Sequence, residues 1–105
     1  MGIKQFKLQL RVVWLENFLG LAVDNVILNQ SYSLTPYYFW PKTEALEQLK
    51  LELDSKLWLC QEDKVKILKL AGDVISYWFS NRDLKTAKKN FTEDFPEVKI
   101  LIFNN

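Results

Sequence analysis

The chain has 105 residues, of which 49% are hydrophobic and 26% are charged, and this size and balance are typical of a single globular domain. Fourteen lysines and arginines oppose thirteen aspartates and glutamates, so the net charge of +1 excludes a protein that holds RNA by overall charge alone. One cysteine and no histidine exclude an internal disulfide, a cysteine–histidine zinc site and catalysis by a Ser–His or Cys–His pair.

Two strands are predicted at the start of the chain. Apolar residues occupy every second position over residues 6–14, which indicates a strand with one buried face. The alternation resumes over residues 19–23, so we predict an antiparallel hairpin with its loop at 16–18. Residues 24–25, Asp-Asn, then indicate either a bulge or the end of the strand. The polar turn formers of residues 29–36, NQSYSLTP, predict a loop.

A run of four aromatic residues, Tyr37, Tyr38, Phe39 and Trp40, is closed by Pro41. Because proline disfavours a helical conformation in the residue before it, we predict a short third strand here. In a strand, Tyr38 and Trp40 share one face, and Tyr37 and Phe39 share the other. One face is expected to fill the core, and the other to lie on a neighbouring strand, a partner or water. Burial is favoured for Phe39 and Trp40, whereas the hydroxyl of Tyr37 or Tyr38 could face a partner.

Two helices are predicted to follow. The first spans about residues 44–55, with Thr43 as its N-cap and leucines at helical spacing on one face. The second spans about residues 62–79 and begins with two acidic residues, which suit the helix dipole. Its apolar stripe is expected to consist of Val65, Leu68, Ala71, Ile75 and Trp78, widened by Ile67, Val74 and Phe79.

The rest of the chain completes a predicted α+β fold. Residues 81–90, NRDLKTAKKN, indicate a short third helix or a loop, and residues 98–103 a closing strand. We expect a small antiparallel sheet, built from the N-terminal hairpin plus short strands, covered on one face by two antiparallel helices. Residues 1–105 would form a single domain, with 81–105 as a C-terminal extension.

Basic residues gather at two places. Lys7 and Arg11 share one face of the first predicted strand. Between residues 82 and 89 there is one acid among four bases, and a helix would bring positions 82, 85 and 89 together. A solvated polar face explains any single lysine, but as a group this segment is the better candidate for phosphate contact. Its basic residues are Arg82, Lys85, Lys88 and Lys89.

Features of enzymes are weak in this sequence. The acidic pairs at 62–63 and 93–94 are adjacent in sequence and so do not face each other, which favours a helix N-terminus and a solvated loop over paired catalytic carboxylates. Three glycines at scattered positions cannot build a phosphate-binding loop. Cys60 precedes a predicted helix, where a capping or partly buried thiol is favoured over a reactive one. No catalytic residue, metal ligand or cofactor is predicted.

Three segments, RVVWLENFLGLAVD, LTPYYFWPKTEALEQLKLELDSKLW and VISYWF, follow one another in this order. Together they resemble the plastid-specific ribosomal protein 3 family, a component of the small ribosomal subunit of chloroplasts with cyanobacterial relatives. The resemblance extends from about Phe6 to Trp78. Four positions depart from the family pattern: Lys42 stands in place of an arginine, Leu46 of a tryptophan, Leu57 of a proline and Cys60 of a small capping residue.

The resemblance implies a structural constituent of the plastid small ribosomal subunit, docked on ribosomal RNA and neighbouring ribosomal proteins, with no membrane and no small-molecule substrate as partner. Because no transit peptide precedes Met1, we expect a plastid or cyanobacterial gene, and a location in the plastid stroma or the cyanobacterial cytoplasm. The alternative is a ribosome-associated adaptor or translation regulator that uses residues 37–40 as its hot spot. The expected phosphate contacts are Lys7, Arg11, Lys42, Arg82, Lys85, Lys88 and Lys89.

Overall fold

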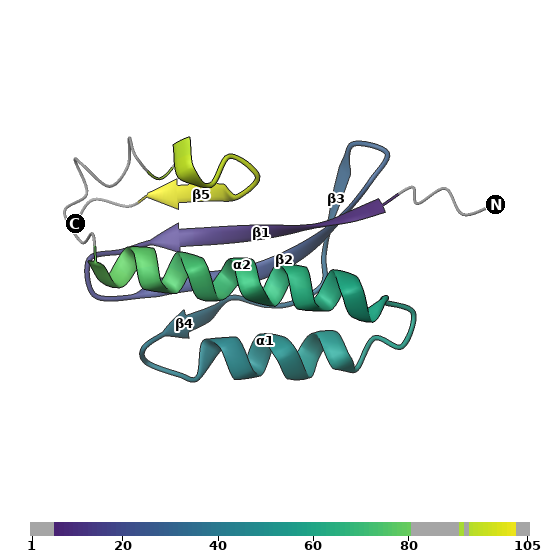
Figure 1. Cartoon of the computed structure of the whole chain (residues 1–105), viewed down its shortest axis with the longest axis horizontal. Coiled ribbons are helices and arrows are strands. Elements are labelled where there is room, and N and C mark those ends of the chain that lie inside the picture. Colours follow the sequence, from purple (N-terminus) through teal and green to yellow (C-terminus); the bar gives the residue numbers. More distant parts are fainter. Residues whose placement is uncertain (1–5, 81–90, 92, 103–105) are drawn as a thin grey trace.

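The computed structural model describes residues 6–80, 91 and 93–102, and places a sheet on one side of this part of the chain and two helices on the other (Figure 1). The helices α1 and α2 lie side by side across the same face of the sheet (Figure 1). This arrangement confirms the predicted α+β class. In chain order the elements are β1 (Phe6–Trp14), β2 (Leu19–Ile27), β3 (Gln30–Ser33), β4 (Tyr38–Trp40), α1 (Ala45–Asp54), α2 (Gln61–Ser80) and β5 (Lys99–Ile102).

The hairpin of β1 and β2 forms the centre of the sheet. The two strands pair antiparallel along their full length, and the amide of Leu15 donates a hydrogen bond of 3.0 Å to the carbonyl of Phe18. The predicted loop at 16–18 is therefore confirmed. β2 continues through Asp24 and Asn25 in unbroken register, so these two buried polar residues mark neither a bulge nor a strand end.

The sheet is mixed, which corrects the prediction of an antiparallel one. β5 pairs parallel with β1, with Lys99 opposite Arg11. A parallel neighbour requires a long crossover connection, and the chain between β1 and β5 contains both helices. The strand order is β3-β2-β1-β5, and β4 pairs with the Leu19 end of β2.

β3 shows that the predicted loop over 29–36 was wrong for residues 30–33. Leu28 and Asn29 have positive φ angles of 50° and 69°, which is the conformation of a two-residue hairpin turn. This turn lets β3 pair with residues 24–27 of β2. All four residues of β3 are exposed, so its polar composition reflects a solvated edge ribbon rather than a loop.

The start of α1 also differs from the prediction. The N-cap position is taken by Glu44, whose side chain makes no capping hydrogen bond. Thr43, the predicted cap, instead donates its hydroxyl to the carbonyl of Phe39 at 3.1 Å, and its amide donates to the same oxygen at 2.9 Å. The turn that follows β4 therefore uses the hydroxyl that the sequence assigned to the helix, and ties α1 to the sheet.

The buried stripe of α2 is shifted from the predicted one. Val65 and Phe79 are 54% and 66% exposed, whereas Leu68 and Ile75 are only partly buried. Both stripes satisfy helical spacing, and the choice between them depends on how α1 and the sheet pack against α2. The buried residues of α2 are Lys64, Ile67, Ala71, Val74 and Trp78.

An aromatic cluster closes the core at the C-terminal end of α2. Trp78 is fully buried, and its indole Nε1 donates a hydrogen bond of 3.0 Å to the carbonyl of Leu15 in the hairpin loop. Trp14 packs edge-on against Phe91 and Tyr77, with ring centroids 5.5 and 6.3 Å apart. These contacts join segments far apart in sequence and hold α2 against the hairpin. Among the residues described, no helix has both the length and the apolarity that a membrane span requires.

Candidate nucleic-acid interface

The face of the sheet opposite the helices is formed by the odd-numbered residues of β1. Residues 8, 10, 12 and 14 contribute to the core beneath the helices, so the alternation of a strand directs Lys7, Gln9, Arg11 and Val13 the other way. No helix that the structure describes packs on this second face. The structure therefore brings the two predicted phosphate contacts of β1, exposed Lys7 and half-buried Arg11, to one surface.

Arg11 lies in a more specific environment than the sequence predicted. Its Nε is 3.0 Å from a carboxylate oxygen of Asp24, which is only 2% exposed. Its guanidinium also lies over the ring of Tyr37, 5.3 Å from the centroid. Part of the charge of Arg11 is thus balanced inside the protein, and its flat face covers an aromatic ring.

Phe39 continues this surface next to Tyr37, with ring centroids 6.3 Å apart. Phe39 lies opposite Gly20 in the pairing of β4 with β2, and a Cβ atom at Gly20 would come within 2.8 Å of the Phe39 ring. The missing side chain at position 20 is therefore what leaves room for the Phe39 ring on β2.

A second cation–aromatic pair lies at the adjacent turns. Nζ of Lys42 is 5.9 Å from the centroid of the Phe18 ring, and Phe18 is 37% exposed. The two turns are neighbours because the strand ends that they join, Leu19 and Trp40, are paired in the sheet. Phe18 comes directly before Leu19, and Lys42 comes two residues after Trp40. We call the surface formed by these two groups the cation–aromatic face; it consists of Arg11, Phe18, Tyr37, Phe39 and Lys42.

Sequence reasoning missed two residues at or beside this face. Phe18 lies in the hairpin loop, and its large aromatic side chain was the only feature of the sequence that could have marked it as a site residue. Lys99 is exposed and lies opposite Arg11 in the parallel pairing, so its side chain belongs to the same side of the sheet. The closing strand was predicted from the sequence, but the identity of its neighbouring strand was not.

The other half of the aromatic run belongs to the core, as the alternation allowed. Tyr38 and Trp40 pack against the buried cluster beneath the helices. Burial raises the pKa of the Tyr38 hydroxyl above its ordinary value, and the Glu52 carboxylate raises it further. The run is thus divided between two roles: Tyr38 and Trp40 anchor β4, while Tyr37 and Phe39 cover the opposite face.

Of the remaining residues that the sequence singled out, some lie in the part of the chain that the structure describes and others lie outside it. Cys60 is a free thiol directly before α2, where a capping or partly buried residue was expected. It is exposed, so the alternative of partial burial was wrong. Within the described ranges, no group of histidine, cysteine, aspartate and glutamate side chains could hold a metal ion. The predicted phosphate contacts Arg82, Lys85, Lys88 and Lys89 lie outside the described residues.

The chemistry of the cation–aromatic face suits a nucleic acid. Aromatic rings offer stacking surfaces for unpaired bases, and lysine and arginine attract phosphates. Arg11 and Lys42 lie beside rings, so one ligand could contact both kinds of group.

Comparisons with known proteins agree on one family. A sequence model of plastid and cyanobacterial ribosomal proteins (PSRP-3/Ycf65) matches residues 34–81, a region that contains β4, α1 and α2. The small ribosomal subunit protein cS23 of Cyanidium caldarium is 42% identical over 99 residues, which cover 91% of this chain and 94% of that protein. The probable small ribosomal subunit protein cS23 of Synechococcus sp. (strain JA-3-3Ab) is 40% identical over 94 residues, covering 90% and 94%. The small ribosomal subunit protein cS23y of Arabidopsis thaliana is 40% identical over 76 residues, covering 71% of this chain and 42% of that protein.

Proposed function

The chain belongs to the plastid and cyanobacterial ribosomal protein family PSRP-3/Ycf65, and from this membership we propose that it is a structural constituent of a small ribosomal subunit that docks on ribosomal RNA through its cation–aromatic face. Its role is to occupy a site in the particle rather than to catalyse a reaction. The working compartment is the plastid stroma, or the cytoplasm if the gene is cyanobacterial.

The observation that carries this proposal is the grouping of rings and cations on a sheet face that no described helix covers. Arg11 lies over Tyr37, whose ring neighbours that of Phe39, and Lys42 lies over Phe18 at the turns next to the Leu19–Trp40 pair. With a net charge of +1, long-range attraction to RNA is weak, so contacts at a defined surface have to supply the selectivity. A folded RNA that presents phosphates and splayed bases at matching positions fits this surface.

Sedimentation tests the ribosomal role. A tagged chain expressed in a plastid or cyanobacterial host is expected to sediment with small subunits in moderate salt, in stoichiometric amounts and independently of growth conditions. Recovery only at the top of the gradient would reject the proposal. Amounts that vary with growth conditions would instead support the adaptor or regulator.

Charge reversal then tests the docking face. Lys42→Glu places a negative charge on the cation–aromatic face, whereas Lys50→Glu makes the same change on α1, where Lys50 is exposed and pairs with Asp54 at 3.2 Å. We expect the Lys42→Glu variant to leave the subunit at lower salt than the wild type, with the salt slope of binding reduced by about 1. The Lys50→Glu variant should behave like the wild type. If both variants leave the subunit at the same salt concentration, the cation–aromatic face is not the docking surface.

A further inference from the structure

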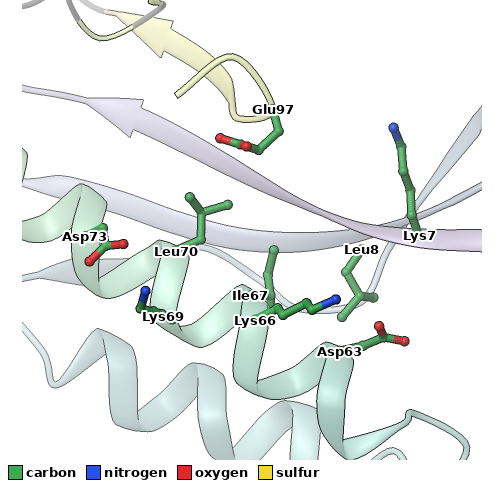
Figure 2. Close-up of a pocket in the computed structure, with 9 residues that line it drawn as sticks. All are labelled: Lys7, Leu8, Asp63, Lys66, Ile67, Lys69, Leu70, Asp73 and Glu97. Carbon is green, nitrogen blue, oxygen red and sulfur yellow. The ribbon is translucent and has the colours of Figure 1, made fainter. Parts of the chain in front are cut away.

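A groove runs between α2 and β1 on the helical side of the sheet, close to the start of β5 (Figure 2). Its volume is about 470 Å³. Figure 2 shows Leu8 projecting from β1 towards α2, and Ile67 and Leu70 projecting from α2 towards the sheet. Ile67 is buried, but Leu8 and Leu70 are only partly buried, so the apolar floor of the groove remains open to a ligand.

Backbone groups of β1 that no described strand pairs with border this groove. The hydrogen bond from Leu15 to Phe18 closes the hairpin, so in the alternating antiparallel ladder the odd-numbered residues of β1 exchange hydrogen bonds with β2. The even-numbered residues point their N–H and C=O groups to the opposite edge. β5 covers that edge only from Arg11 to Trp14, along one half of β1 (Figure 1). Among the described residues, no strand pairs with Leu8 on this side.

The charges around the groove help to identify its occupant. Two lysines of α2, Lys66 and Lys69, border the groove together with the carboxylates of Asp63, Asp73 and Glu97. The side chain of Lys7 points away from α2 (Figure 2), so the rim has no net positive charge to attract a polyanion. RNA is therefore a poor match. A polypeptide in extended conformation matches on two counts, because it offers backbone donors and acceptors to the free edge and an apolar side chain at every second position to the floor.

We propose that this groove receives an extended segment of a neighbouring ribosomal protein, which pairs with the free edge of β1 at Leu8 and inserts an apolar side chain between Leu8, Ile67 and Leu70. The bound segment continues the line of β5 along β1 and completes the sheet at that edge. Its polar side chains face the alternating charges of the rim. This inference rests on the proposed ribosomal role, since it takes the partner from the same particle.

Site-specific photo-crosslinking tests the proposal. A benzophenone amino acid is placed at Leu70 in one variant and at Leu68 in another, and small subunits are purified from cells that express each tagged chain. Leu68 is the matched control, because it is also a partly buried leucine of α2 but lines a different groove, beside α1. Position 70 is expected to cross-link to one defined segment of a neighbouring ribosomal protein, and position 68 is not. Amide exchange of residues 6–10 should also be slower in the subunit than in the free protein.

The outcomes separate this inference from the ribosomal role. If the wild-type chain does not sediment with small subunits, the proposed function fails. If it does sediment, but position 70 cross-links to RNA, to a second copy, to other parts of its own chain or to nothing, the groove proposal alone is overturned. As a second measurement, Leu70→Asp should reduce the amount retained on the subunit about tenfold relative to Leu68→Asp. Equal retention of two variants that both fold, as judged by thermal unfolding, would also overturn it.

Discussion

Replacing Gly20 by alanine should destabilise the protein, although glycine to alanine in regular structure usually has the opposite effect. A Cβ at this position would lie 2.8 Å from Cε1 of Phe39 and 3.2 Å from both Cδ1 of Phe39 and Cβ of Val13. The Phe39 ring could move away only by leaving its place beside Tyr37. The Cβ of Val13 is fixed to its own backbone and has much less freedom to move.

Two contributions of opposite sign determine how much Gly20→Ala changes the free energy of unfolding. Overpacking of this kind lowers the free energy of unfolding by about 1–3 kcal/mol. The reduced backbone entropy of the unfolded chain raises it by about 0.4–1 kcal/mol. The net expectation for Gly20→Ala is a loss of about 1–2 kcal/mol, equivalent to a Tm lower by about 4–16 °C for a domain of this size.

Gly72→Ala supplies the control, because it makes the same chemical change on the other layer. A Cβ at Gly72 would meet Cδ2 of Leu46 at 3.9 Å, an ordinary contact, in the middle of α2. This variant should gain about 0.5–1 kcal/mol from helix propensity. Thermal and urea unfolding followed by circular dichroism measure both. If the Gly20→Ala protein is as stable as the wild type, the close packing of Phe39 on β2 is refuted. The same conclusion follows if Gly20→Ala lowers the free energy of unfolding by the same amount in a Phe39→Leu variant as in the wild type.

Three further predictions follow from particular contacts. Arg11→Met leaves the buried carboxylate of Asp24 without its partner at 3.0 Å, so the free energy of unfolding measured in urea should fall by about 1–3 kcal/mol. The double variant Arg11→Met/Asp24→Asn should recover part of this loss, and no recovery would contradict the pairing. Trp78→Phe removes the hydrogen bond to the carbonyl of Leu15 and should cost about 1–3 kcal/mol in thermal unfolding; an unchanged Tm would show that this bond is dispensable. Burial raises the pKa of Tyr77, as do Asp94 and Glu93, and burial and Glu52 raise that of Tyr38. The folded state therefore holds these protons more tightly, and its stabilisation is complete below about pH 10 and lost as pH rises through the folded-state values. Alkaline unfolding should be less steep in Tyr77→Phe than in the wild type, and equal steepness would argue against the raised pKa.

Local patterns predicted most elements of this fold. Strict alternation identified β1 and β2, and the loop at 16–18 followed from the short gap between them. β3 was missed because its residues are all exposed, so no buried face marked it as a strand. The turn that creates it has leucine at a position with positive φ, where asparagine or glycine would be the usual signal. The parallel pairing of β5 depends on a crossover through both helices, which no local pattern encodes.

The candidate site was predicted only in part, for a similar reason. The alternation correctly divided the aromatic run into a core face and an outer face, and it placed Lys7 and Arg11 together. Pairing between strands then determined the rest. Asp24 is adjacent to Arg11 only through the register of β1 with β2, and Tyr37 reaches Arg11 only because β4 pairs with the same strand.

The pairing of Arg11 with Asp24 changes how this surface would hold RNA. Because a buried carboxylate balances part of the guanidinium charge, the face offers less free positive charge than its basic residues suggest. Tyr37 and Phe39 then contribute relatively more through stacking, which depends little on salt. We therefore expect the affinity for RNA to depend only weakly on salt concentration. We also expect that removing the ring at position 39 causes a large loss of binding. A steep slope with a dispensable ring would instead place the docking contacts on lysines elsewhere in the chain.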